Sequence, residues 1–281
     1  MTQCIPNGYT RISQIRGGDM KVKSSVILAI LNTIGFLGTI VVNSLANALP
    51  INNKTTGELS DQYPNLFVPA GITFSIWGVI YLLLAIFIVY QLITVFNRGR
   101  RDSSFIPKIG IWFFIASLAN MGWIFAWHYE MVPLSLVIML LLLGSLIMIY
   151  LRLNIGRSDA TPMEKFMVHL PFSVYLGWIT IATIANLTAL LVFAGWSSFG
   201  LDDQIWAVIV IVVGIAIAFQ ILLTRRDIYY CLVVDWALLG ILLKRLSVEA
   251  VSDEYVLGIT IIGLVLVTLA IIIQIIRKEV Y

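Results

Sequence analysis

The stretch that decides the fold reads Pro69-Ala70-Gly71-Ile72-Thr73-Phe74-Ser75-Ile76-Trp77-Gly78-Val79-Ile80-Tyr81. It lies at the start of one of eight long apolar segments, which short loops separate. A hydrocarbon core of about 30 Å needs roughly 20 apolar residues per helix. On this basis we place the spans near 25–49, 67–96, 107–127, 131–151, 166–194, 204–223, 228–243 and 255–276.

The composition points to a membrane protein. The chain is 60% hydrophobic and 12% charged, and its mean hydropathy of +0.96 excludes a water-soluble globule. Helices satisfy their own backbone hydrogen bonds in lipid, so we expect an all-α, polytopic transmembrane bundle. The alternating segments of about 10 residues that a β-barrel requires are missing. The segment 228–243 is the weakest span, because it is short and carries Asp235; a re-entrant or tightly packed segment is the alternative there.

The basic residues predict the orientation of the chain in the membrane. Loops rich in Lys and Arg face the cytoplasm. With eight spans, all of the 18 basic residues except Lys54, Lys244 and Arg245 fall on one side, together with both termini. We therefore expect the N-terminus and the C-terminus in the cytoplasm.

Polar residues and tryptophans gather in the first five spans, whereas 204–223 and 255–276 are almost entirely Val, Ile and Leu. This contrast predicts three parts. They are a cytoplasmic N-terminal tail (1–24), a five-helix core (25–196) and a three-helix C-terminal extension (197–281).

Three polar stripes follow helical spacing within the core, and polar residues inside a span usually face the bundle interior. Indole rings with carboxamides suit a pocket for a flat, largely apolar ligand. The alternative is that the Asn side chains join helices by hydrogen bonds while tryptophans sit in interfacial belts. We favour the belt for Trp127, Trp196 and Trp206, and the pocket for Trp178. The stripes are Asn43 with Asn47, Asn120 with Trp123, and Trp178 with Ala182 and Asn186.

These residues resemble the translocator protein or tryptophan-rich sensory protein (TspO) family. In that family a Pro precedes a Trp by eight residues and an aromatic residue follows four later, as Pro69, Trp77 and Tyr81 do here. The family's third helix is similar to Leu118-Ala119-Asn120 with Trp123 and Pro133, with one residue inserted between Leu and Asn. Its fifth helix is similar to Pro171 and Tyr175 through Trp178, Ala182 and Asn186.

The resemblance implies a five-helix bundle whose pocket opens toward the loop between the first two helices, here 50–66. Family members bind porphyrins and other hydrophobic ligands and are linked to sterol or tetrapyrrole handling and to stress signalling. The sequence departs from the family at Met139, where an acidic residue is frequent, at Gly144, where a Trp is frequent, and in its three further helices. The ligand-binding residues carried over are Trp77, Asn120, Trp123, Trp178, Ala182 and Asn186.

We accordingly expect a sensor, carrier or transport-linked receptor for a planar hydrophobic ligand of the porphyrin, haem-like or sterol type. The alternative is a secondary transporter or proton-coupled permease that uses Asp235 and the C-terminal helices. A buried carboxylate is costly, so Asp235 is either a proton or ion site or is hydrogen-bonded to a neighbouring helix.

The sequence contains few features that are typical of an enzyme. His128 and His169 fall on opposite faces of the membrane and cannot share a metal, and no nucleophile or phosphate-binding motif occurs. We expect no catalytic residue, no metal and no required cofactor, with breakdown of a bound porphyrin as a remote enzymatic alternative. The expected partners are the lipid bilayer and the hydrophobic ligand. Nucleic acid is not expected, and the face carrying Gly35 and Gly38 would permit a homodimer.

Overall fold

The computed structural model describes residues 8–48, 51–97, 103–197, 200–247, 253–277 and 281, apart from the side chains of 8–23 and Asn47. All regular structure in these residues is helical. The long helices are α1 (Gly8–Ala48), α3 (Ile76–Phe96), α5 (Trp112–His128), α6 (Val132–Leu153), α8 (Leu170–Phe193), α9 (Asp203–Arg225), α10 (Ile228–Ser247) and α11 (Glu254–Ile276). The short elements are η1 (Ile51–Asn53), α2 (Thr56–Asp61), η2 (Gly71–Ser75), α4 (Phe105–Ile109), α7 (Pro162–Glu164) and η3 (Lys165–His169), of which η3 is a π-helical turn.

Six of the described helical segments are long and apolar enough to cross a membrane. They are Ser24–Ala46, Gly71–Phe96, Val132–Leu153, Pro162–Phe193, Asp203–Arg225 and Glu254–Ile276. The other two expected spans also form helices. Helix α5 has 17 residues, which is close to the shortest length that crosses a bilayer. Helix α10 has 20 residues and carries Asp235, Lys244 and Arg245. The expected polytopic helical bundle is confirmed.

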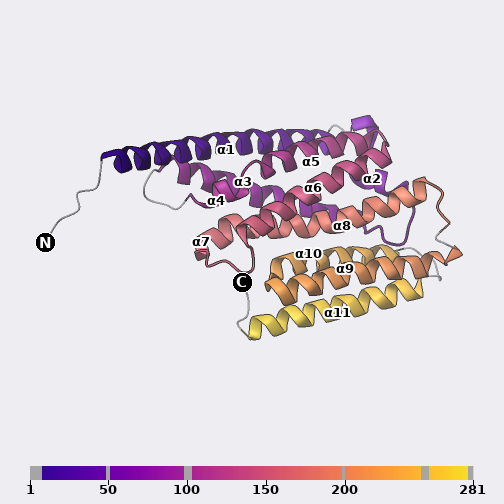
Figure 1. Ribbon diagram of the computed structural model, residues 1–281. Coiled ribbons are helices and arrows are strands. Elements are labelled where there is room, and N and C mark those ends of the chain that lie inside the picture. Colours follow the sequence, from indigo (N-terminus) through magenta and orange to yellow (C-terminus); the bar gives the residue numbers. More distant parts are fainter. Residues whose placement is uncertain (1–7, 49–50, 98–102, 198–199, 248–252, 278–280) are drawn as a thin grey trace.

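The long helices form two layers (Figure 1). Helices α1, α3, α5, α6 and α8 make up one layer, and α9, α10 and α11 pack beneath it. Within the first layer α5 packs against α1 and α6, and α6 packs against α8. Helix α10 joins the layers, because it contacts α8 on one side and α9 and α11 on the other. We call the two ends of the bundle the α2 end and the α4 end after the short helices there.

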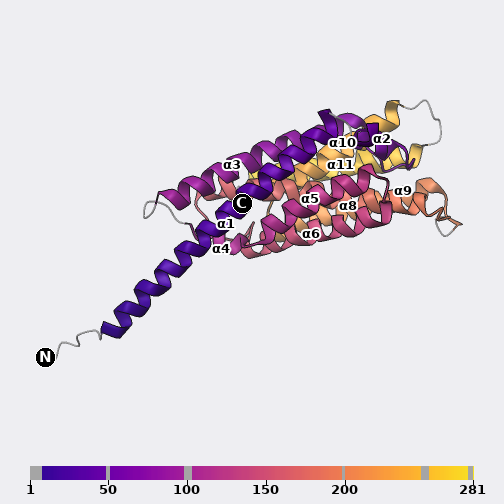
Figure 2. The same cartoon turned by 90° about the horizontal axis from the view of Figure 1, so that it is seen from above.

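The first helix is longer than its apolar span. Helix α1 starts at Gly8 and runs for 41 residues without a break, whereas the part that is apolar enough to cross a membrane is Ser24–Ala46, next to the expected tail of residues 1–24. Its N-terminal part extends beyond the bundle (Figure 2). Hydropathy locates the apolar half of such a helix and gives no stop signal where the helix continues into polar sequence.

The glycine face of α1 is used inside the chain. A Cβ at Gly35 would lie 2.9 Å from Cβ of Ser117, and one at Gly38 would lie 2.9 Å from Sδ of Met121. Both neighbours belong to α5, so these glycines let α1 and α5 approach closely. They therefore give no argument for a homodimer, which stays a prediction.

Candidate functional site

A small cavity lies inside the first layer at the α2 end. Its walls come from α2, η2, α3, α5 and α8, and its volume is about 40 Å³. Four tryptophans and one phenylalanine contribute most of its aromatic surface. The lining residues are Thr56, Ser60, Pro69, Phe74, Trp77, Trp123, Trp127, Trp178, Ile181, Ala182, Ala185 and Asn186.

The aromatic rings around the cavity pack against one another in two groups. The Trp178 ring lies edge-on to Trp77 at 6.2 Å and to Phe74 at 6.0 Å between ring centroids. On the other wall Trp123 stacks on Trp127 at 5.8 Å with an interplanar angle of 14°. These are favourable aromatic arrangements, so the rings of each group stabilise one another's positions.

The polar groups of the cavity differ in how they are satisfied. Trp123 Nε1 donates a 2.9 Å hydrogen bond to Asn186 Oδ1, and Asn186 also bonds to Ser135 Oγ at 3.0 Å. Within the part of the chain that the structure describes, the indole N–H of Trp178 has no hydrogen-bond partner, although the side chain is only 3% exposed. A buried donor without a partner is costly, so Trp178 Nε1 is the group that a bound acceptor would relieve.

Five of the six ligand-binding residues inferred from the sequence line this cavity, and Asn120 does not. Asn120 is fully buried and joins three helices: it accepts a 2.7 Å hydrogen bond from Asn43 Nδ2 and donates a 3.1 Å bond to the Tyr175 hydroxyl. For Asn43 and Asn120 the helix-joining interpretation therefore describes the contacts. The side chain of Asn47 lies outside the described residues.

The belt interpretation is wrong for Trp127. Its side chain is 5% exposed, lines the cavity and donates a 3.3 Å hydrogen bond to the Thr56 carbonyl in α2. The sequence does indicate that Trp127 faces the cavity, since it follows Trp123 by four residues and so lies on the same face of the helix. Thr56, Ser60, Pro69 and Phe74 were also missed, because their approach to the cavity depends on how the loop before α3 folds.

Helix α2 covers the cavity at its end of the bundle. Thr55 caps it, with the backbone N–H of Glu58 donating to Thr55 Oγ1 and the Glu58 carboxylate accepting from the Thr55 N–H. That second bond lowers the pKa of the exposed Glu58 carboxyl. Besides the Trp127 bond, Tyr63 packs its ring 5.7 Å from that of Trp127. Leu59 of α2 is fully buried and Asp61 pairs with Lys244 of α10 at 3.0 Å, so the short helix is anchored to both layers.

A larger groove of about 730 Å³ runs beside the cavity. It lies among α1, α2 and α3, with Asn43, Trp77 and Tyr81 among its lining residues. Trp77 and Phe74 border both spaces. The two rings thus form the partition between the cavity and the groove.

Asp235 lies away from these spaces. It is half-buried on α10, where Thr268 of α11 donates a 2.8 Å hydrogen bond to its Oδ2, while Oδ1 is buried and finds no partner in the described ranges. It lines neither the cavity nor the groove. The hydrogen bond from Thr268 agrees with the interpretation that Asp235 is bonded to a neighbouring helix.

The helical bundle and its buried aromatic cavity define a multi-pass integral membrane protein with a hydrophobic internal site. The chain belongs to the family described as TSPO-like protein, whose profile matches residues 29–274. The matched region includes α9 and α10 and most of α11, as well as the first layer. Comparison with curated proteins and with solved structures gave no match.

Proposed function

We propose that this protein binds a planar hydrophobic ligand of the porphyrin, haem-like or sterol type in the tryptophan-lined cavity, and acts as a sensor, carrier or transport-linked receptor. The observation that carries the proposal is the convergence of four indoles on one buried space, with the Trp178 N–H left unpaired. Aromatic walls supply stacking area, and a lone buried donor supplies orientation.

Binding requires the cavity to widen. Pockets for small ligands measure roughly 300–1,000 Å³, whereas this cavity measures about 40 Å³. Two of its walls are suited to move. Helix α2 is only six residues long and lines the cavity with Thr56 and Ser60, and the Trp77–Phe74 partition faces the neighbouring groove. We infer that ligand uptake displaces one or both of them.

The test is a titration of the purified protein with protoporphyrin IX, followed by quenching of tryptophan fluorescence. Trp178→Phe keeps most of the ring volume and removes the donor, so the affinity should fall about 3- to 10-fold, the value of one net hydrogen bond. Asn186→Ala should also weaken binding, because the Trp123 ring loses the hydrogen bond that fixes its position on the cavity wall. Trp112→Phe is the matched control, since Trp112 is half-buried at the start of α5 and does not line the cavity. Unchanged affinity in both cavity variants would contradict the proposal.

We propose no catalytic step and no required cofactor. The absorbance spectrum of bound porphyrin should therefore stay constant over hours. A time-dependent loss of the porphyrin bands that Trp178→Phe abolishes would instead favour enzymatic breakdown.

The second candidate function is proton-coupled transport, which the unpartnered Oδ1 of Asp235 favours. Asp235→Asn separates the two functions, because an Asn oxygen still accepts the hydrogen bond from Thr268. In a ligand-binding protein the variant binds porphyrin like the parent. In a permease it abolishes pH-dependent uptake.

A further inference from the structure

A second and larger cleft lies at the α2 end between the two layers of helices. Its volume is about 1000 Å³, and its walls come from the segment before η2, the end of α8, the starts of α9 and α11, and the end of α10. Because span-long helices begin and end here, the cleft lies at the level of a bilayer surface. It is separate from the tryptophan-lined cavity, although Phe67 and Val68 line the cleft and the next residue, Pro69, lines the cavity.

One side of the cleft is basic. Lys244 pairs with Asp61 at 3.0 Å, and Arg245 pairs with Asp253 at 3.1 Å through Nη1. Each cation keeps further hydrogen-bond capacity. An ammonium has three donors, and Arg245 Nε has no partner among the described residues although this side chain is only 9% exposed. The basic side can therefore still donate to an anionic oxygen.

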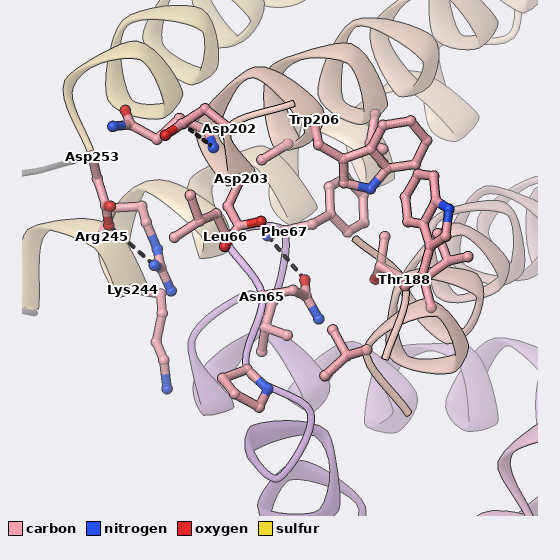
Figure 3. A pocket seen from close by; sticks show the side chains of 18 of the residues that line it. Asn65, Leu66, Phe67, Thr188, Asp202, Asp203, Trp206, Lys244, Arg245 and Asp253 are labelled. Carbon is pink, nitrogen blue, oxygen red and sulfur yellow. Dashed lines mark hydrogen bonds and ion pairs between the residues drawn. The ribbon is translucent and has the colours of Figure 1, made fainter. Parts of the chain in front are cut away.

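The other side is aromatic and acidic. Trp196 and Trp206 form an edge-to-face pair with centroids 4.7 Å apart. Asp202 caps α9 by accepting from the Gln204 N–H, and Asp203 follows at the first turn with an exposed carboxylate. In the close view Lys244 and Arg245 lie on one side and Trp206 on the other, with Asp203 between them (Figure 3). Indole faces next to a carboxylate attract organic ammonium groups.

We propose that this cleft binds the head group of a zwitterionic phospholipid. Lys244 and Arg245 Nε donate to the phosphate, and Trp206, Trp196 and Asp203 hold the ammonium. The apolar floor, which includes Phe67, Leu191 and Val210, accepts part of the acyl chains. The proposal concerns a site other than the porphyrin-type cavity and stands without it.

The charges argue against two simpler occupants. A simple anion would be repelled by the four carboxylates that line the cleft, and both cations are already in ion pairs. The carboxylates belong to Asp61, Asp202, Asp203 and Asp253. A metal ion lacks ligands, because no group of three His, Cys, Asp or Glu side chains in the described parts of the chain is placed to hold one. A ligand that carries both signs matches both sides of the cleft.

The test is isothermal titration of the full chain, in maltoside micelles, with dihexanoyl phosphatidylcholine below its own micelle concentration. Dihexanoyl phosphatidylglycerol has the same chains and phosphate without the ammonium, and free phosphocholine has the head group without the chains. We expect saturable binding of the zwitterionic lipid, about tenfold tighter than that of either comparison ligand.

Trp206→Phe and Asp203→Asn should each weaken binding of the phosphatidylcholine about tenfold, and Lys244→Gln should weaken binding of both lipids. Asp203 is exposed, so its variant tests the site without disturbing packing. The controls are Trp112→Phe and the exposed Asp159→Asn at the α4 end. Porphyrin affinity should not change in Trp206→Phe, which separates this proposal from the first.

Equal affinity for the two lipids would overturn the proposal, as would parental affinity in both Trp206→Phe and Asp203→Asn. If free phosphocholine binds as tightly as the lipid, the acyl chains do not contribute to binding. The ligand is then a soluble choline phosphate and not a membrane lipid.

Discussion

Asp227 shows how one carboxylate can join two layers of a membrane protein. It lies in the loop between α9 and α10 with 2% of its surface exposed. It accepts hydrogen bonds from the Tyr150 hydroxyl of α6 at 2.9 Å, from Ser173 Oγ of α8 at 2.7 Å and from the Tyr230 N–H of α10 at 3.2 Å. Burial raises the pKa of this carboxyl, and the hydrogen bonds oppose that rise in part.

This raised pKa predicts a dependence of stability on pH. The folded protein holds the Asp227 proton more tightly than the unfolded chain does. The bound proton therefore stabilises the folded state fully below the ordinary Asp pKa of about 3.9. This stabilisation is lost as the pH rises through the pKa of Asp227 in the folded protein. Asp227→Asn fixes a neutral side chain that still accepts a hydrogen bond. We expect the melting temperature of the variant to fall less than that of the parent as the pH rises above about 4.

Thermal unfolding in detergent across this pH range measures the effect. Asp159→Asn, which changes an exposed carboxylate at the same end of the bundle, should keep the parental pH profile. If Asp227→Asn keeps it as well, the buried carboxylate does not contribute in the way described.

At the scale of elements, α10 positions the segment that precedes α3. The Ala70 N–H donates a 2.9 Å hydrogen bond to the Gly240 carbonyl, and Trp236 Nε1 donates a 2.9 Å bond to the Thr73 carbonyl. The same segment supplies Pro69 and Phe74 to the cavity. The three C-terminal helices therefore take part in shaping a site that lies in the first layer.

Gly240→Ala should disturb this contact. A Cβ at Gly240 would overlap Thr73 Oγ1 and lie 2.9 Å from Thr73 Cβ, so η2 must shift. Overpacking of this kind costs about 1–3 kcal/mol. We expect a lower melting temperature together with weaker porphyrin quenching.

Gly258→Ala in α11 is the matched control for this change. A Cβ there meets nothing within 4 Å, and Ala is favoured over Gly in a helix by up to about 1 kcal/mol. The control should therefore match or exceed the stability of the parent. Parental stability and binding in Gly240→Ala would show that the contact between α10 and η2 is not tight.

The sequence predicts elements whose cause is local. Apolar run length located the helices, and the four-residue spacing from Trp178 to Asn186 placed Trp178, Ala182 and Asn186 on one wall of the cavity. The contacts made by Gly240, Asp227 and Thr56 depend on how distant segments meet. Hydropathy and spacing along one helix do not carry that information. Trp196, which follows the end of α8, pairs with Trp206 of α9, and no spacing within a helix predicts this contact.

At the scale of the whole molecule, the start of α1 and Tyr281 both lie toward the α4 end of the bundle (Figure 1). A chain that crosses the membrane an even number of times has both ends on the same side. Eight long helices give an even number of crossings if α5 and α10 cross the membrane as well as the other six. Helix α5, at 17 residues, spans about 26 Å. The distribution of basic residues then predicts that the α4 end faces the cytoplasm.

Labelling of single cysteines in intact cells decides this orientation. Cys4 and Cys231 are first replaced by Ser, and Gln62→Cys and Asp159→Cys are then made separately; both positions are exposed, at the α2 end and the α4 end respectively. A membrane-impermeant maleimide should label position 62 directly and position 159 only after the membrane is permeabilised. The opposite pattern would reverse the orientation. Labelling of both positions from one side would mean that the helices between them cross an even number of times, which requires α5 or another helix of the first layer to lie outside the bilayer. The pair of positions therefore tests both the direction of the chain and the assignment of α5 as a span.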